Sequence, residues 1–261
     1  MPRDEIPIGV IGNDDVGPAI AQRLAACGYR ALYAAAPGSP LVTRATRLEP
    51  VPTPAEIAFE CEYALVAIED TETLRALLIG DADHTGLGAE MKPGSVIVDL
   101  GARSPRELQA MLGLLGTRGV AVTDAAIISD VPAISEGRAK VLVGGFPDAV
   151  DQIEPILTAL GRIERTGPLG SAHASAALMS YVETARTIAR EEAFAIATAC
   201  GINGDALARM LADDPSTPNT VDRRTARRAE LARRIGLEFA VSADIIDFEA
   251  EKRARQRHEN R

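Results

Sequence analysis

The stretch IGVIGNDDVGPAI, residues 8–20, decides the fold. Its first half is a short apolar run of β-forming residues that ends at Gly12. Its second half starts an apolar pattern of helical period at Val16, which continues through Ile20 and Leu24. A buried strand that runs through a glycine-containing turn into a helix is typical of the first unit of a dinucleotide-binding domain. The stretch therefore predicts that kind of domain.

The turn between this strand and this helix departs from the usual glycine pattern at one position. Gly12 and Gly17 stand where glycine gives a tight turn and close helix packing, but Asp14 stands where backbone would approach a pyrophosphate. A carboxylate there repels a phosphate by about 1 kcal/mol at 4 Å in water. Alternatively, Asp14 or Asp15 caps the helix. The turn residues that we expect to contact a cofactor are Gly12, Asn13, Val16 and Gly17.

Strands and helices alternate along the next 150 residues. Apolar runs predict strands, and segments of helical period predict helices, with Thr71 and Ser104 as N-caps and Pro105 in a first turn. The predicted strands lie in 31–35, 63–68, 92–101, 119–127 and 139–145, and the helices in 71–80, 104–115 and 146–161. This alternation predicts an α/β fold with a doubly wound parallel sheet of the Rossmann type.

The alternating pattern ends near residue 166, and the rest of the chain has helical character. We expect helices over 171–200, 204–213 and 218–256. The predicted organisation is a dinucleotide-binding domain over 1–166 and a helical domain over 167–261. Apolar residues of helical period in the second part predict that it forms a homodimer.

Composition limits the classes of partner. Charged residues make up 25 % of the chain, aromatic residues 3 %, and the net charge is −9, which disfavours binding to nucleic acids. A signal peptide and a long apolar span are not evident, so we expect a cytoplasmic protein that does not bind membranes. Cys27, Cys61 and Cys200 are widely spaced, so we expect buried thiols and no metal site.

Four further segments carry a resemblance to a known family: EMKPGSVIVDLGARSP at 90–105, VTDAAI at 122–127, VLVGG at 141–145 and GPLGSAHASAALMSYVETA at 167–185. Together with the glycine turn, they resemble the β-hydroxyacid dehydrogenase and 6-phosphogluconate dehydrogenase superfamily over about residues 6–203. The resemblance implies an NAD(P)-binding domain joined to a helical domain that often dimerises, with a small-molecule substrate between them.

The chain departs from this family on the cofactor side. An acidic residue or an arginine at the end of the second strand would select NAD or NADP, but Ala34 to Ala36 occupy that place. Ser39, Arg44 and Arg47 are candidates for a 2′-phosphate, or else belong to a solvated loop. Where the family has a Ser-Thr pair, this chain has Gly101 and Ala102. We expect Ile68 and Ala102 to complete the cofactor contacts, and the cofactor is NADP, NAD or none.

The substrate side also departs from the family. After the aspartate of VTDAAI, relatives hold a substrate carboxylate with a Ser-Gly-Gly segment, whereas this chain has Ser129 and Asp130. An aspartate there would suit a cationic group on the substrate, or it would only shape a turn. We name Ser129, Asp130 and Tyr181 as candidate substrate contacts.

In an ungapped alignment, the catalytic lysine and asparagine of the family fall at Ala176 and Ser180. A shift of one or two residues would put Ala177 or Leu178 at the lysine position instead, so this chain lacks that lysine in either case. His173, Ser180 and Glu183 lie on one helical stripe and are our catalytic candidates, because a glutamate in an apolar cleft can act as an acid. The resemblance also places histidine and glutamate at these positions in 6-phosphogluconate dehydrogenases. Alternatively, Glu183 forms an ion pair with Arg186 or Arg190.

Two functions are therefore open. The first is an NAD(P)-dependent oxidoreductase acting on a small carbonyl or imine, with a degenerate cofactor turn. The second is a non-redox enzyme, such as a lyase or isomerase, or a catalytically silent binding or scaffold protein on the same fold. The resemblance favours the first. Four departures from the family favour the second: Asp14, Ala34 to Ala36, Gly101 with Ala102, and Ala176.

Overall fold

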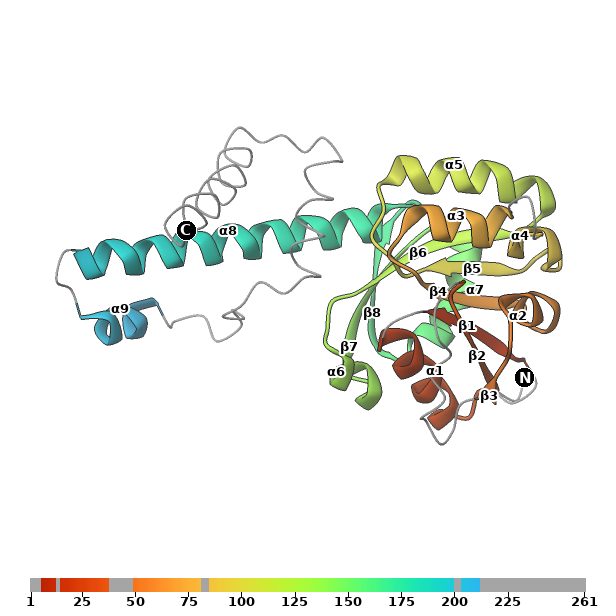
Figure 1. Ribbon diagram of the computed structural model, residues 1–261, viewed down its shortest axis with the longest axis horizontal. Coiled ribbons are helices and arrows are strands. Elements are labelled where there is room, and N and C mark those ends of the chain that lie inside the picture. Colours follow the sequence, from red (N-terminus) through yellow and green to blue (C-terminus); the bar gives the residue numbers. More distant parts are fainter. Residues whose placement is uncertain (1–5, 13–14, 38–48, 81–84, 200–202, 212–261) are drawn as a thin grey trace, which may run out of the picture. The chain divides into compact units, whose positions relative to one another are not determined.

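The computed structural model describes residues 6–12, 15–37, 49–80, 85–199 and 203–211 (Figure 1). Several predictions therefore lie outside the described residues: the contacts of Asn13, the role of Asp14, the 2′-phosphate candidates, the burial of Cys200, and the helix over 218–256. The chain divides into two compact units, Met1–Ala176 and Ala177–Arg261. The sequence places the boundary about ten residues earlier, where the sheet pattern stops.

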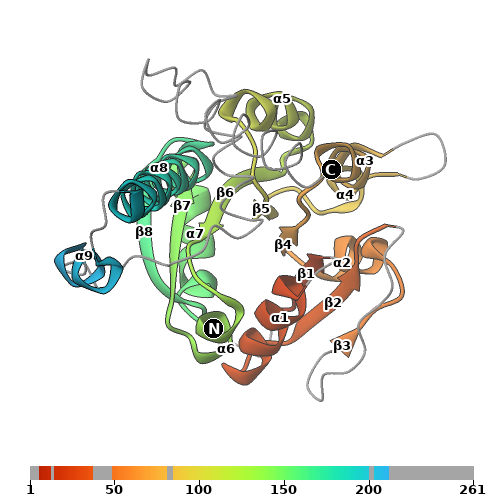
Figure 2. The same cartoon turned by 60° about the vertical axis from the view of Figure 1, so that its left-hand side comes forward.

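The first unit contains one eight-stranded sheet in the order β3-β2-β1-β4-β5-β6-β7-β8 (Figure 2). The strands are β1 (Ile8–Gly12), β2 (Ala31–Ala35), β3 (Glu49–Pro50), β4 (Tyr63–Ala67), β5 (Val96–Asp99), β6 (Ala121–Ile127), β7 (Ala139–Gly144) and β8 (Gly161–Gly167). Strands β1 to β6 pair in parallel. This arrangement confirms the predicted Rossmann-type fold.

The expectation of a parallel sheet fails at one pair, because β6 and β7 run antiparallel. The helix between them, α6, spans only Val131–Glu136. Six helical residues rise about 9 Å, which is too short to return the chain along a strand the length of β6. The chain turns back instead, and β8 then pairs in parallel with β7 at the edge of the sheet.

Helices cover both faces of the sheet (Figures 1 and 2). Their apolar side chains and those of the strands form two separate cores. One core contains α1 (Val16–Ala26), α6 and α7 (Pro147–Leu157). The other contains α2 (Pro54–Glu60), α3 (Thr71–Ile79), α4 (Leu87–Glu90) and α5 (Pro105–Leu115), which a short 3-10 turn, η1 (Gly116–Arg118), extends. The helical stretch predicted from residue 171 is α8 (Ser171–Ala199), and α9 (Gly204–Leu211) follows it. None of the helices in the described part of the chain has the length and apolar character needed to cross a membrane.

Of the two predicted N-caps, Ser104 is correct and Thr71 is not. Ser104 accepts a hydrogen bond from the Glu107 backbone N–H, and the Glu107 carboxylate accepts from the Ser104 N–H, so the predicted start of α5 is confirmed. The predicted cap of α3 is wrong by one residue. Asp70 caps this helix by accepting from the Thr73 N–H at 2.7 Å, and Thr71 is the first helical residue. An aspartate accepts such a bond without having to orient a hydroxyl proton.

The two described cysteines differ in environment. Cys61 is buried as predicted, and burial raises the pKa of its thiol to about 12. Cys27 is only half-buried, so the prediction of full burial is wrong for it, because it lies in the open turn at the C-terminal end of α1.

This difference predicts how the thiols react. At pH 8, a thiol with a pKa of about 12 is ionised in roughly one molecule in ten thousand, and only the thiolate attacks alkylating reagents. We expect Cys61 to stay unmodified by iodoacetamide under conditions that label unfolded protein fully, and to react faster as the pH rises. Peptide mass spectrometry of the native and urea-unfolded protein, with Cys61→Ala as the control, measures this. Rapid native labelling of Cys61 at pH 8 would refute it.

Candidate functional site

The carboxyl ends of three neighbouring strands meet at one edge of the sheet. Gly12 at the end of β1 pairs with Ala67 at the end of β4, and Val66 pairs with Asp99 at the end of β5. The strand order reverses direction at β1, with β2 on one side and β4 on the other. In open α/β sheets, ligands bind outside the carboxyl ends of the strands at such a switch point. This edge is therefore the candidate site.

Gly12 and Gly17 pack tightly against each other at this edge. A Cβ atom on Gly12 would lie 3.2 Å from Gly17 Cα, and one on Gly17 would lie 3.3 Å from the Tyr33 ring. Both glycines therefore bring the start of α1 close to β1, which is the arrangement that presents a helix N-terminus to a pyrophosphate. The residues present at this end of α1 fit a dinucleotide.

Tyr33 holds the end of β1 in place, although it was not among the predicted site residues. Its side chain is fully buried in β2, and its hydroxyl donates to the Gly12 carbonyl oxygen at 3.1 Å. The Ala36 N–H donates to the same oxygen at 3.0 Å. The available signal was a tyrosine within an apolar strand, since a buried phenol usually finds a hydrogen-bond partner.

Asp15 is exposed at the N-cap position of α1, but its side chain makes no capping hydrogen bond. Asp15 therefore stands at the predicted N-cap position but does not cap the helix through its side chain, and the other candidate cap, Asp14, lies outside the described residues. The Asp15 backbone is already helical at φ −71° and ψ −15°, whereas a capping side chain usually belongs to a residue in the extended region.

The connections after β4 and β5 lie beside each other at this edge. Ile68 is buried, and Ala102 is half-buried. Between them lies the Arg103 side chain, which is 0 % exposed and forms an ion pair with Asp99, 3.2 Å from Arg103 Nε to Asp99 Oδ2. This pair could not be predicted from the sequence, because an arginine between a strand and a helix is usually solvated.

A second buried carboxylate joins the sheet to the start of α8. Asp124 is fully buried in β6 and accepts from the Gly170 N–H at 2.6 Å and the His173 N–H at 3.0 Å. His173 Nε2 lies 3.1 Å from the Asp99 carbonyl oxygen and 3.2 Å from that of Ala125, so this nitrogen carries the proton. Among the described residues, His173 Nδ1 is buried with no hydrogen-bond partner.

The candidate substrate residues Ser129 and Asp130 lie in the connection after β6. Asp130 accepts from the Ala133 N–H at 3.0 Å and caps α6, which supports the turn-shaping alternative. The Ser129 hydroxyl donates to the Ile128 carbonyl oxygen at 2.7 Å and accepts from the Lys140 N–H at 3.0 Å. Local structure therefore uses both side chains, and substrate contact by either residue stays a prediction.

The remaining candidate site residues lie on α8, in the second unit. Ser180 is buried, and Tyr181 and Glu183 are half-buried on α8. Glu183 Oε1 forms an ion pair with Arg186 at 3.0 Å, as the alternative interpretation predicted. Its other oxygen, Oε2, is buried and has no hydrogen-bond partner among the described residues.

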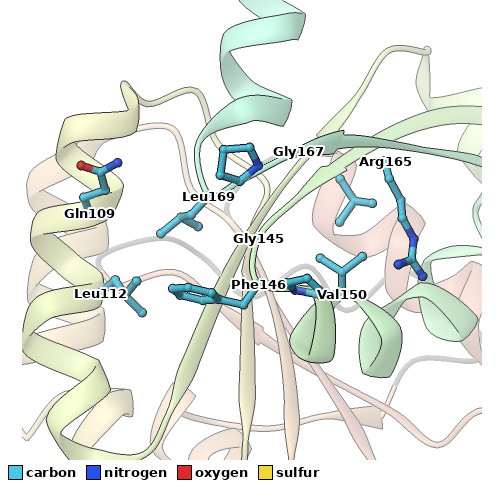
Figure 3. Close-up of a pocket in the computed structure, with 11 residues that line it drawn as sticks. Gln109, Leu112, Gly145, Phe146, Val150, Arg165, Gly167 and Leu169 are labelled. Atoms are coloured by element: carbon cyan, nitrogen blue, oxygen red, sulfur yellow. The ribbon is translucent and has the colours of Figure 1, made fainter.

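The first unit also holds a cavity of about 510 Å³ between α5, the start of α7 and the segment after β8 (Figure 3). Leu112, Phe146, Val150 and Leu169 give it an apolar lining. Its one charged lining residue, Arg165, forms ion pairs outside the lining with Asp151 and Glu154. The cavity includes none of the sequence-predicted site residues. The part of the chain that is described also contains no cluster of side chains able to hold a metal ion.

A Rossmann-type sheet with a glycine turn at its switch point defines a class, the dinucleotide-binding proteins. Comparison with protein families is more specific. Residues 7–174 match the NAD binding domain of 6-phosphogluconate dehydrogenase, so the chain belongs to this family, within the β-hydroxyacid dehydrogenase-like oxidoreductases. The cofactor of the family is NAD or NADP.

Individual relatives are distant. The chain is 26 % identical to L-threonate dehydrogenase of Cupriavidus necator over 77 % of its own length and 67 % of that protein. It is 25 % identical to NAD-dependent L-serine dehydrogenase of Pseudomonas aeruginosa over 49 % of its own length, and this match spans only 44 % of that protein.

A solved structure, 3-hydroxyisobutyrate dehydrogenase of Mycobacterium tuberculosis with L-serine, superposes with a TM-score of 0.79 at 17 % identity. The superposition covers 95 % of this chain and 94 % of that one. An imine reductase from Myxococcus stipitatus with NAD⁺ gives 0.69 at 18 % identity, over 79 % of this chain and 71 % of that one. At these identities, the structures establish the shared fold.

Proposed function

We propose that this protein is an NAD(P)-dependent oxidoreductase that acts on a small carbonyl or imine substrate. The observation that carries the proposal is the close packing of Gly12 on Gly17 at the carboxyl edge of the sheet. Because neither residue has a side chain, the N-terminus of α1 lies close to the end of β1. In this fold, that N-terminus faces the position of the pyrophosphate. When bound, the nicotinamide would give or take a hydride.

The residues around the edge fit distinct parts of the cofactor. Gly12 and Gly17, with the first turn of α1, would hold the pyrophosphate. Ile68 and Ala102, in the connections after β4 and β5, would lie beside the nicotinamide half. The buried Ile68 side chain would help to exclude water there.

Proton transfer needs a group other than the missing lysine. Ala176 is buried and carries nothing that titrates. Glu183 is our choice, because its Oε2 is buried without a hydrogen-bond partner among the described residues, while Arg186 holds Oε1. The carboxyl is thus oriented by one oxygen, and the other remains available for a proton.

The substrate class follows from the altered residues. Asp130 caps α6, but its carboxylate still brings a negative charge to the connection after β6, where relatives offer a Ser-Gly-Gly segment. A carboxylate-bearing hydroxy acid bound beside that connection would be repelled. An imine that is protonated before reduction carries a positive charge, which Asp130 would tolerate.

The proposal is tested by following NADPH and NADH absorbance with a panel of cyclic imines, small ketones and 3-hydroxy acids, the last with NADP⁺ and NAD⁺. We expect turnover with at least one imine or carbonyl, and turnover of cationic substrates ahead of acidic ones. Binding of a cofactor without turnover of any panel member would favour the second candidate, a silent or non-redox protein, which the buried Ala176 at the lysine position supports.

Glu183→Gln tests the proton donor. We expect kcat to fall about 100-fold or more while the cofactor Kd stays unchanged, because general acids contribute roughly 10² to 10⁴ in rate. Glu191→Gln, the same change at an exposed position of α8, is the matched control and should keep full activity. Full activity in Glu183→Gln would remove this residue from the mechanism.

A further inference from the structure

Arg103 occupies an unusual place for a cation. It is the largest fully buried side chain in the described residues, and it lies between the end of β5 and the Ser104 cap of α5. Its guanidinium donates to the Ile68 carbonyl oxygen through Nη2 and to the Glu69 carbonyl oxygen through Nη1, at 3.4 Å. Two successive carbonyls of the connection after β4 are therefore held by a side chain from the connection after β5.

The pairing with Asp99 keeps the guanidinium in that place. Asp99 is also fully buried, and its second oxygen accepts from the Gly101 N–H at 3.1 Å. One carboxylate thus orients both the arginine and the backbone of the segment that leads to it. An apolar side chain would be the simpler way to fill a core, since buried ion pairs rarely add net stability. The Asp99–Arg103 pair is therefore better explained by its effect on the positions of the connections after β4 and β5.

The buried position of the Arg103 guanidinium requires glycine at residue 101. A Cβ atom on Gly101 would lie 2.5 Å from the Ile68 carbonyl oxygen, 2.7 Å from Arg103 Nη2 and closer still to Nη1. The Gly101 backbone does not have a positive φ, so space is what requires glycine here. The loss of a side chain at residue 101, which the sequence analysis interpreted as a departure at the cofactor site, makes room for the guanidinium.

We propose that Arg103, with Gly101, is a positioning residue for the cofactor. It sets the separation of the connections after β4 and β5, and so the places of Ile68 and Ala102, without touching the cofactor itself. This inference rests on the proposed function, because the two connections form the nicotinamide side of the proposed pocket.

The test measures the cofactor Kd by nicotinamide fluorescence, with whichever dinucleotide the wild-type protein binds. The variants are Arg103→Met, Arg103→Lys and Gly101→Ala. We expect the Kd to rise at least tenfold in Arg103→Met and in Gly101→Ala, and less in Arg103→Lys, which keeps a donor. The double variant Gly101→Ala/Arg103→Met should bind no more weakly than either single variant, because both changes break the same contact.

Leu115→Ala is the matched control for lost stability. Leu115 is buried at the far end of α5, away from the carboxyl edge, so its truncation should destabilise the protein and leave the Kd unchanged. A wild-type Kd in Arg103→Lys and Gly101→Ala would overturn the inference, as would an equal rise in Leu115→Ala. If the wild-type protein binds neither dinucleotide, the proposed function fails together with this role. If it binds and the variants bind equally well, only this role fails.

Discussion

Replacing Asp124 with alanine is expected to lower the free energy of unfolding by about 3 kcal/mol, because it leaves two buried backbone donors without an acceptor. Those donors are the N–H groups of Gly170 and His173, at the start of α8. The contact spans more than 40 residues of sequence and fixes the beginning of the long helix to β6. Losing it should therefore loosen the first turns of α8.

Urea unfolding followed by circular dichroism measures this change. Asp124→Asn should cost roughly half as much, because the amide keeps one acceptor oxygen. Asp148→Ala is the control, since Asp148 is an exposed aspartate in the first turn of α7, and its loss should cost less than about 1 kcal/mol. An Asp124→Ala variant as stable as this control would contradict the assignment.

Arg103→Met is expected to cost about 3 to 5 kcal/mol in free energy of unfolding, because it leaves the buried Asp99 carboxylate without its cation. In the double variant Asp99→Asn/Arg103→Met, the charge is gone as well. That variant should be more stable than Arg103→Met alone by roughly 2 kcal/mol.

A double-mutant cycle, with urea unfolding of each variant, measures the coupling free energy between residues 99 and 103. Coupling of at least about 1 kcal/mol between residues 99 and 103 is the predicted outcome, since residues in one buried ion pair are not additive. If the costs of the two single changes simply add, the pair does not act as a unit.

Much of the fold could be predicted because local patterns and global structure agree. Residues 8–20 predict β1 and α1, and the sequence from Ser104 predicts α5 with its cap. The edge strand β8 was missed. Each of its residues, GRIERTG, is exposed or half-buried, and three of the seven are charged, so the sequence has no apolar run there. The antiparallel return of β7 depends on the length of α6, which could not be read from the apolar pattern.

The site was harder to predict, because its decisive contacts join distant residues. Asp124 and Arg103 are charged, and charged side chains are usually exposed, so a single sequence gives no sign that either is buried. The change at Gly101 was visible, but its reason was not, since that reason is the guanidinium two residues further on. The close approach of Gly12 and Gly17 was predicted correctly, because these two residues are near each other in the sequence.

We expect the carboxyl edge at Gly12 and Gly17 to bind a dinucleotide. Titration of the purified protein with NADPH and NADH tests it most directly, by nicotinamide fluorescence and thermal unfolding. At about 100 times the Kd, a bound cofactor should stabilise the fold by roughly 2.7 kcal/mol, and Asp14→Gly should bind more tightly. If the folded protein binds neither dinucleotide at millimolar concentration, this edge is not a dinucleotide site.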